Sequence, residues 1–514
     1  MKKMQLNPER GSFLFAITVS IPIAAIALGA YAERSLRNLE AAQRYRAEAA
    51  ALHFAKGGVE KALLELDLDP DWRAGFSSAA LAYGTYSVTV EDDSTIPVLS
   101  GLVRIRSIGT AVGVQGNSVQ AVAVMAATEA IETIAGNGDS IWNGDGLAGT
   151  DTAIASPYGL AMDPSGNLWF TSESRIRKWD QATGTISTPV GSGYGSIVAG
   201  DDVGDGGPMS LARFNDPRGI SFSPDGKLLY IADAGNGLIR TANVGPDVQL
   251  YWGFGMAQLP LMPGNIDRLA GGTPLGFSGD GFYASMARFG ADVNGATVDS
   301  NGVVFVSDAS NQRVRAINNG LFPVIIGAVV IPAGWIATVY GNGTTSYGFS
   351  GALGTTAGMS DPGPVTLDSS ENVWVPLAGH DEVYRLDRTT GLIWHEGGAS
   401  FASSPLDGGA VTSAGLGDPT GLALYSDGSW VLASTGYHTV RRIDTSGIID
   451  AVAGRSYSQG FRPDNGPACI SLCDTPRCVV GDPSISSEFF FTDQQNHRIR
   501  KVSRRIVVYN YTEG

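Results

Sequence analysis

The sequence has few charges, few cysteines and few histidines for its length, and each shortage argues against a class of protein. Charged residues make up 17% of the 514, and the net charge of −15 includes no basic cluster, which argues against nucleic-acid binding. The three cysteines lie within ten residues and cannot form a disulfide framework. Glycine, by contrast, is abundant at 68 residues, and 43% of the chain is hydrophobic. This composition indicates a β protein with many turns and a large core.

An uncharged run of 21 residues, 12–32, lies near the start of the chain. A helix of that length spans about 30 Å and could cross a bilayer. Lys2, Lys3 and Arg10 precede the run, so the positive-inside tendency predicts that the rest of the chain lies outside the cytoplasm. The helical pattern continues beyond Glu33, which argues against a cleaved secretory signal.

Residues 33–66 are rich in Ala, Leu, Glu and Arg, with apolar residues at helical spacing. Together with the uncharged run, this segment predicts one long helix over 12–66. Three alternating segments follow and predict a small antiparallel sheet over 84–127, with strands at 84–92, 101–113 and 117–127.

The N-terminal region resembles type IV pilin-like proteins of the minor pilin and pseudopilin type. The resemblance rests on a short leader ending in Gly11, an apolar helix beginning at Ser12 and the stretch AKGGVEKALLEL at 55–66. It implies that a prepilin peptidase removes residues 1–11 and that residues 12–130 form a pilin-like domain. Ala16 stands where most pilins have Glu, so the choice between a major and a tip subunit stays open. The resemblance assigns the filament core to Phe13, Phe15, Ile17, Val19, Ile21, Pro22, Ile26 and Leu28.

From Ile131 onward the sequence repeats a unit of strands separated by turns. A further strand of the type I-x-T-[IV]-x-G follows each unit, which gives four strands per repeat, as in a propeller blade. These residues resemble NHL repeats and imply a six-bladed NHL-type β-propeller over 131–514. The strand at 132–136 is expected to complete the last blade and close the ring, with 505–510 competing for that place. The six copies are 156–180, 216–242, 292–317, 361–387, 418–444 and 475–503.

Two features that recur in the repeat are candidates for functional sites. Loops containing Gly and Asp recur between blades and suggest calcium, but most carry one Asp beside turn glycines, which favours a structural turn. An arginine recurs in the third strand and is interpreted as scaffold. The loops, called the Gly-Asp loops below, are 143–146, 204–207, 278–281, 406–409 and 464–466, and the arginines are Arg177, Arg240, Arg315, Arg441 and Arg500.

The other reactive residues suggest no catalytic site, metal site or cofactor. His438 and His497 occupy the same position of the repeat and are interpreted as turn residues, which leaves His380 and His395, too few for a histidine metal cluster. No nucleophile motif is present, so we expect no enzyme activity. One short disulfide is possible among Cys469, Cys473 and Cys478.

The sequence therefore predicts an α+β pilin-like domain, with a long N-terminal helix and a small antiparallel sheet, followed by an all-β six-bladed propeller. We expect a subunit of a type IV pilus-like extracellular filament. Its partners would be copies of itself, the pilus assembly machinery, the inner membrane before assembly and an unknown surface ligand. The alternatives are a single-pass membrane-anchored binding or sensing propeller and, third, a propeller enzyme. Two apolar insertions, 241–265 and 318–335, suggest buried extra strands or an interface with a neighbouring subunit at Trp252, Phe254 and Phe322.

Overall fold

The computed structural model describes residues 76–505, apart from 82–83, 93–102, 113–117, 196–202, 254–256, 401–403, 462–463, 465–467, 469–470 and 483–487. The chain divides into two compact units. One comprises Met1–Ala130, Pro463–Cys469 and Ser503–Gly514, and the other comprises Ile131–Arg462 and Ile470–Val502. The expected leader, the helix over 12–66 and its filament-core residues lie outside the described residues.

The described residues are all-β, which corrects the α+β class expected for the N-terminal part. That class rested on the helical spacing of 12–66, whereas the β-branched and alternating residues from Phe76 onward form strands. Within the described ranges no helix is long and apolar enough to cross a membrane. The helices there are three-residue 3-10 turns: η3 (Gly149–Asp151), η4 (Met209–Leu211), η5 (Ala234–Asn236), η6 (Ala284–Met286), η7 (Ala309–Asn311), η8 (Gly354–Thr356), η9 (Ala378–His380), η10 (Val411–Ser413) and η11 (Thr435–Tyr437).

The N-terminal unit contains an antiparallel meander. Its strands are paired in the order β1-β2-β3-β4, and β2 and β3 match two of the strands expected from the sequence closely. The fourth is longer than expected because its alternating apolar residues continue without a turn signal. The strands are β1 (Phe76–Leu81), β2 (Gly84–Asp92), β3 (Val103–Val112) and β4 (Ser118–Ala135).

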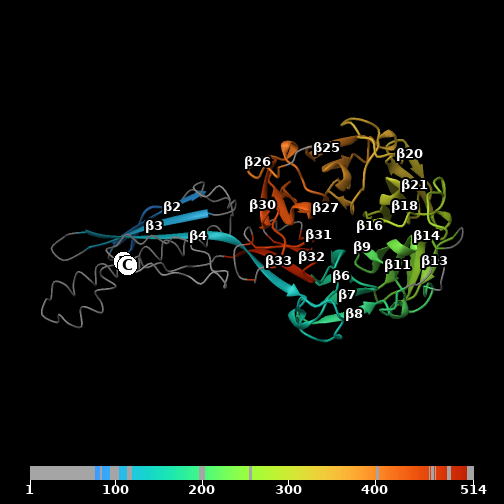
Figure 1. Ribbon diagram of the computed structural model, residues 1–514, viewed down its shortest axis with the longest axis horizontal. Helices are drawn as coiled ribbons and strands as arrows, with labels where there is room; N and C mark the ends of the chain where they lie inside the picture. The colour runs from blue at the N-terminus through green and yellow to red at the C-terminus, as the bar shows by residue number, and fades with distance from the viewer. Residues whose placement is uncertain are drawn as a thin grey trace. The chain divides into compact units, whose positions relative to one another are not determined.

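The other unit is a six-bladed β-propeller, whose blades follow one another around a ring (Figure 1). Blades one to three each have four antiparallel strands, numbered from the centre of the ring outward. Blade one is β5 (Leu160–Met162), β6 (Leu168–Ser172), β7 (Arg175–Trp179) and β8 (Ile186–Val190). Blade two is β9 (Pro217–Phe222), β10 (Leu228–Asp233), β11 (Leu238–Asn243) and β14 (Ile266–Gly271). Blade three is β16 (Val293–Val298), β17 (Val303–Asp308), β18 (Arg313–Asn318) and β21 (Trp335–Tyr340), with β15 (Phe282–Tyr283) outside β21.

Blades four to six repeat the same arrangement. Blade four is β22 (Thr366–Leu367), β23 (Val373–Leu377), β24 (Glu382–Leu386) and β25 (Ile393–Gly398). Blade five is β27 (Pro419–Leu424), β28 (Trp430–Ser434), β29 (Thr439–Ile443) and β30 (Ile448–Gly454), with β26 (Gly409–Ala410) outside β30. Blade six takes three strands from the end of the chain, β31 (Pro476–Val480), β32 (Phe489–Asp493) and β33 (Arg498–Arg505).

The fourth strand of blade six comes from the beginning of the propeller. β4 is hydrogen-bonded to β33, so the expectation that 132–136 closes the ring is confirmed. The competing segment, 505–510, supplies Arg505 to the end of β33, and the remainder lies outside the described residues. Pairing between the two ends of the repeat removes an open strand edge.

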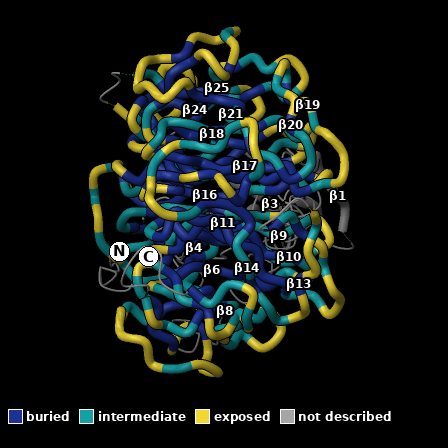
Figure 2. The backbone as a smooth tube through the Cα atoms, turned by 90° about the vertical axis from the view of Figure 1, so that its right-hand side faces the viewer, coloured by how far each residue is buried: buried dark blue, intermediate teal, exposed yellow. Residues whose placement is uncertain are grey.

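The second strand of each blade forms the middle of the core. All six residues of β10 and of β17 are buried, because each strand is flanked within its blade and covered by the neighbouring blades on both faces. The strands are accordingly dark in Figure 2, whereas exposed residues gather in the connections. The propeller is therefore a rigid framework whose differences lie in its loops.

Two hairpins extend blades two and three. They are β12 (Gln249–Tyr251) with β13 (Leu259–Leu261), and β19 (Val324–Ile326) with β20 (Val329–Ile331). One side of each hairpin is buried, at Tyr251 and Leu261 in the first and at Ile326 and Ile331 in the second. The insertions thus form strands, but as separate two-stranded sheets and not as strands added to the blades, and Leu250, Leu321, Phe322 and Ile325 are exposed. The alternative of an interface with a neighbouring subunit stays a prediction.

Candidate functional site

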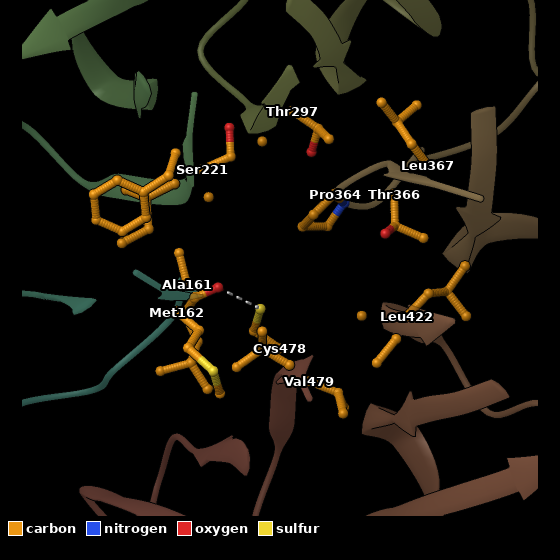
Figure 3. A pocket seen from close by; sticks show the side chains of 18 of the residues that line it. Ala161, Met162, Ser221, Thr297, Pro364, Thr366, Leu367, Leu422, Cys478 and Val479 are labelled. Carbon is orange, nitrogen blue, oxygen red and sulfur yellow. Dashed lines mark hydrogen bonds between the residues drawn. The ribbon is translucent and has the colours of Figure 1, made fainter. Parts of the chain in front are cut away.

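The first strands of all six blades line a central cavity of about 730 Å³ (Figure 3). Its walls expose polar and apolar surface about equally, and the Thr297 hydroxyl is already bonded to the Val365 carbonyl at 2.6 Å. Blade six places Cys478 where four other blades have a glycine and blade four has Pro364, and Cys478 Sγ lies 3.7 Å from the Leu160 carbonyl. Burial raises the pKa of this thiol to about 11, which makes it a poor nucleophile near neutral pH.

The Gly-Asp loops bind the recurring arginines. In blade three, Asp280 accepts hydrogen bonds from Arg315 and from the backbone and hydroxyl of Thr338. The corresponding Asp carboxylates contact Arg177, Arg240 and Arg441 at 3.2, 2.7 and 2.7 Å. These arginines are fully buried, so the carboxylates of these four loops serve as their counter-ions. This arrangement supports the structural interpretation of the loops over the calcium interpretation.

A second scaffold element lies in the turn between strands two and three of a blade. A buried Asp at the end of the second strand accepts a hydrogen bond from an Asn three residues later, and we call the two the scaffold pair. Burial raises the pKa of Asp233 and of Asp493 to about 6, and a buried arginine lies within 3.6 Å of each. The scaffold pairs are Asp233–Asn236, Asp308–Asn311 and Asp493–Asn496 in blades two, three and six.

Blades one, four and five lack the scaffold pair, and in blade one Ser172 ends the second strand while the third strand already begins at Arg175. Leu377 and His380 occupy its two positions in blade four, and Ser434 and Tyr437 occupy them in blade five. Blade four also lacks the arginine and its counter-ion, because Tyr384 pairs with His395 where Arg315 pairs with Thr338 in blade three. The position equivalent to Asp280 is Ser350, whose hydroxyl accepts the backbone N–H of His395 at 3.4 Å. Blades four and five, which are adjacent, are therefore two of the three blades that depart from the scaffold pair.

A cavity of about 460 Å³ lies at these altered turns, and we call it the blade 4/5 cavity. Residues of η9 and η11 contribute to its wall, so His380 and Tyr437, which replace the Asn of the scaffold pair in the two blades, face one space. Its lining residues are Tyr347, Ala378, Gly379, His380, Asp381, Ser400, Gly417, Asp418, Gly436 and Tyr437.

His380 is the most buried polar side chain of this cavity, with 4% of its surface exposed. Its Nε2 lies 2.9 Å from the Thr345 carbonyl, which can only accept, so Nε2 carries the proton. In the neutral ring Nδ1 is then an acceptor, and it has no hydrogen-bond partner in the structure. Tyr347 stacks on the imidazole with ring centroids 4.1 Å apart, which fixes its plane. An orphaned buried acceptor in a cavity wall marks a place where a ligand could donate a hydrogen bond.

Two carboxylates complete the polar lining. Asp381 accepts the backbone N–H of Asp418 at 2.8 Å. Burial raises the pKa of Asp381, and the nearby negative charge of Asp418 raises it further. The Asp418 side chain is exposed at the cavity and makes no ion pair with a residue of the described ranges. The site is therefore negatively charged and aromatic.

Behind the cavity, Ser400 connects it to a second polar group. Its hydroxyl donates to Glu382, whose other oxygen, Oε2, has no hydrogen-bond partner. His395 Nε2 lies 4.0 Å from Glu382 and packs edge-on against Tyr384. Burial, followed by the charge of Glu382, raises the pKa of Tyr384 to about 12. His380 and His395 thus belong to the same altered blade. They do not form a common metal site, since the described residues contain no group of three or more His, Cys, Asp or Glu side chains that could hold a metal ion.

His438 and His497 are turn residues, as the repeat predicted. Both have positive φ values, 58° and 53°. Their Nδ1 atoms accept backbone N–H groups of the following blade, at Thr475 and Ser156 respectively. They join blades and do not face the blade 4/5 cavity.

The proposed interface residues Trp252 and Phe322 differ in how far they are exposed. Trp252 is half-buried and bonds to Asn319 and Gly320 of the next insertion at 2.8 and 2.9 Å. Phe322 is 78% exposed, whereas Phe254 lies outside the described residues. Cys473 and Cys478 have free thiols, and Cys469 lies outside the described residues.

Comparison with known proteins supports the propeller. No family model matches the chain. The chain is 29% identical over 103 residues to NHL repeat-containing protein 2 of Bos taurus, covering 20% of this chain and 13% of that protein. The repeat is of the NHL type. A second relative, protein SUPPRESSOR OF QUENCHING 1, chloroplastic, of Arabidopsis thaliana, is 24% identical over 51% of this chain and 22% of its own length. The chain thus spans less than a quarter of either relative.

Solved structures share the fold. A structural genomics protein of unknown function from Bacteroides thetaiotaomicron aligns with a TM-score of 0.50 at 13% identity, over 81% of this chain and 98% of that one. Structures titled as an auxiliary nutrient binding protein from Bacteroides thetaiotaomicron and as a streptogramin B lyase align with TM-scores of only 0.47 and 0.39. These likenesses concern the fold, and the expectation that this NHL propeller is not an enzyme stays a prediction.

The blade 4/5 cavity was missed by sequence reasoning, although a signal for it existed. The copy at 361–387 is one of the two weaker repeats, and its departures from the pattern include Leu377, His380 and Tyr384. The role of each of these residues can be interpreted only when its position in the blade is known. That Tyr437 of the next blade faces the same space required the three-dimensional arrangement.

Proposed function

We propose that the propeller is a ligand-binding module whose ligand occupies the blade 4/5 cavity. The supporting observation is that, in two adjacent blades of the three that lack the scaffold pair, the residues at the Asn position, His380 and Tyr437, line one cavity. A volume of about 460 Å³ lies within the range of small-molecule sites, and binding residues concentrate in loops on rigid scaffolds.

Binding is favoured over catalysis by the state of the candidate nucleophiles. Nδ1 of His380 bonds to no hydroxyl or thiol, so it activates no nucleophile in the described structure. The Ser400 hydroxyl donates to a carboxylate, an arrangement different from a serine activated by a histidine.

The location of this module remains a proposal based on the uncharged run 12–32 and the positive residues before it. We propose that the propeller lies outside the cytoplasm, either displayed on a filament of identical subunits or held by a single membrane anchor. Mass spectrometry of the N-terminus separates the two. A start at Ser12 supports peptidase processing and assembly, whereas a start at Met1 supports the anchor.

Thermal shift measurements on the full chain test the binding function. The probes are glucose, citrate and arginine amide, which represent neutral, anionic and cationic small molecules. We expect one class to raise the Tm of the natural protein and to lose this effect in H380N and Y347A. Asn occupies the position of His380 in three other blades, so H380N is compatible with the turn. Y194A, which removes an exposed tyrosine elsewhere, is the matched control. A shift of equal size in all four proteins, or no shift by any probe, would contradict the proposal.

A further inference from the structure

We propose that the ligand of the blade 4/5 cavity is a small organic cation that presents an ammonium or guanidinium group. This inference rests on the proposed binding function and adds the chemical class of the ligand. It follows from which hydrogen-bonding groups of the cavity are still available and from the charge around them.

Apart from the hydroxyls of Tyr347 and Tyr437, which can also donate, the polar side chains of the lining offer acceptors. Nδ1 of His380 is an acceptor without a partner, and Asp381 and Asp418 are carboxylates. The Ser400 proton is already donated to Glu382, so the oxygen of this hydroxyl is left with its accepting lone pairs. A ligand rich in donors matches these groups.

The backbone donors of the lining are largely committed. Asp418 N–H bonds to the Asp381 carboxylate, and the N–H groups of four further lining residues bond to backbone carbonyls. A sugar hydroxyl or a carboxylate would bring acceptors that find few donors here, whereas an ammonium group brings three donors and no acceptor. The four residues are Ala378, Gly379, Asp381 and Gly436.

Charge and aromatic surface favour the same class. Asp381 and Asp418 lie close enough for one charge to raise the pKa of the other carboxyl, so a cation between them relieves their repulsion. Arg441, the basic group that acts on Asp381, is fully buried and held by Asp407 and two backbone carbonyls. The rings of Tyr347 and Tyr437 line the cavity and supply faces that attract cations.

Calorimetry of the full chain with a matched pair of probes tests this inference. The probes are 1,5-diaminopentane and 1,5-pentanediol, which have the same length and differ in charge and in donors. We expect saturable binding of the diamine and binding of the diol weaker by about tenfold or more. Acetyl-lysine methylamide, as a third probe, shows whether a lysine side chain of a peptide binds as well as a free amine.

Variants locate the binding. D418N removes an exposed charge without disturbing the core and should weaken diamine binding about tenfold. H380N should abolish it, and D151N, an exposed carboxylate on blade one, should leave it unchanged. Equal affinity for the diol, or full affinity in D418N, would overturn the cation assignment. If glucose or citrate instead shifts the Tm in a way that H380N removes, the cation inference fails while the binding function stands.

Discussion

Nδ1 of His497 in blade six accepts the backbone N–H of Ser156 in blade one at 3.0 Å. The two residues are 341 positions apart, and their bond joins the last blade to the first. Gln312 makes the equivalent bond between blades three and four, with its side-chain oxygen 2.9 Å from the Asp361 nitrogen. The residue at this position therefore serves as an acceptor in blades three to six, and a histidine serves only while Nδ1 is unprotonated.

The stability of the natural protein should consequently include a term that depends on His497. Burial and then the charge of Arg498 hold the pKa of His497 below its ordinary 6.5. The unfolded chain therefore binds the proton more readily, so this contribution is present above about pH 6.5 and is lost as the pH falls through the folded-state pKa.

The variant H497Q keeps a hydrogen-bond acceptor at this position and should remove the pH-dependent contribution of His497. Denaturant unfolding at pH 7.5 and pH 5 measures the difference between the two proteins, because Asp233 and Asp493, whose raised pKa values act in the opposite direction, are common to both. An identical pH dependence of the unfolding free energy in both proteins would contradict a stabilising role for the hydrogen bond between His497 and Ser156.

Removal of the counter-ion of a buried arginine should be costly. D280A leaves the guanidinium of Arg315 with its weaker contact to Asp308 at 3.5 Å, and we expect a loss of about 3 kcal/mol in unfolding free energy. The double variant D280S/R315Y reproduces the Ser350 and Tyr384 of blade four and should recover part of that loss. Urea unfolding measures both. A double variant less stable than the single one would show that the pair is not exchangeable between blades.

Chelation should leave the propeller folded. The Asp side chains of four Gly-Asp loops bond to arginine, and a guanidinium in the place of a cation makes a calcium ion unnecessary there. We expect the same Tm with and without EDTA. A large decrease in EDTA, restored by calcium, would return the loops to the calcium interpretation.

The two insertions should respond differently to the loss of an aromatic ring. W252S removes the contacts of the Trp252 ring and its bond to Gly320, so the Tm should fall by several degrees. F322S replaces a side chain that is 78% exposed and should change stability by less than about 0.5 kcal/mol. If W252S is as stable as F322S, the bonds of Trp252 to blade three contribute little.

The local sequence pattern was sufficient to predict the framework of the propeller. The repeated units predicted the blades, and the segment at 132–136 predicted ring closure, because both depend on strand periodicity and on copy number. The partners of the recurring residues could not be inferred in the same way. Asp280 and Arg315 are 35 positions apart and belong to a loop and a strand whose meeting depends on the blade as a whole.

The fold class of the N-terminal part and the blade 4/5 cavity show two other limits of prediction from sequence pattern. Helical spacing in 12–66 set the class of the whole N-terminal part, while the described strands from Phe76 onward follow an alternation of period two. The cavity depends on departures from the repeat rather than on the repeat. His380 looked like an isolated histidine until its position beside Tyr437 was known.

The central claim is that the altered turns of blades four and five form a ligand site. A crystal structure of the full chain with bound 1,5-diaminopentane tests it most directly. The account predicts electron density in the blade 4/5 cavity, with one ammonium group within hydrogen-bond distance of His380 Nδ1 and near the carboxylates of Asp381 and Asp418. A diamine found in the central cavity or elsewhere, with only water between His380 and Asp418, would contradict it.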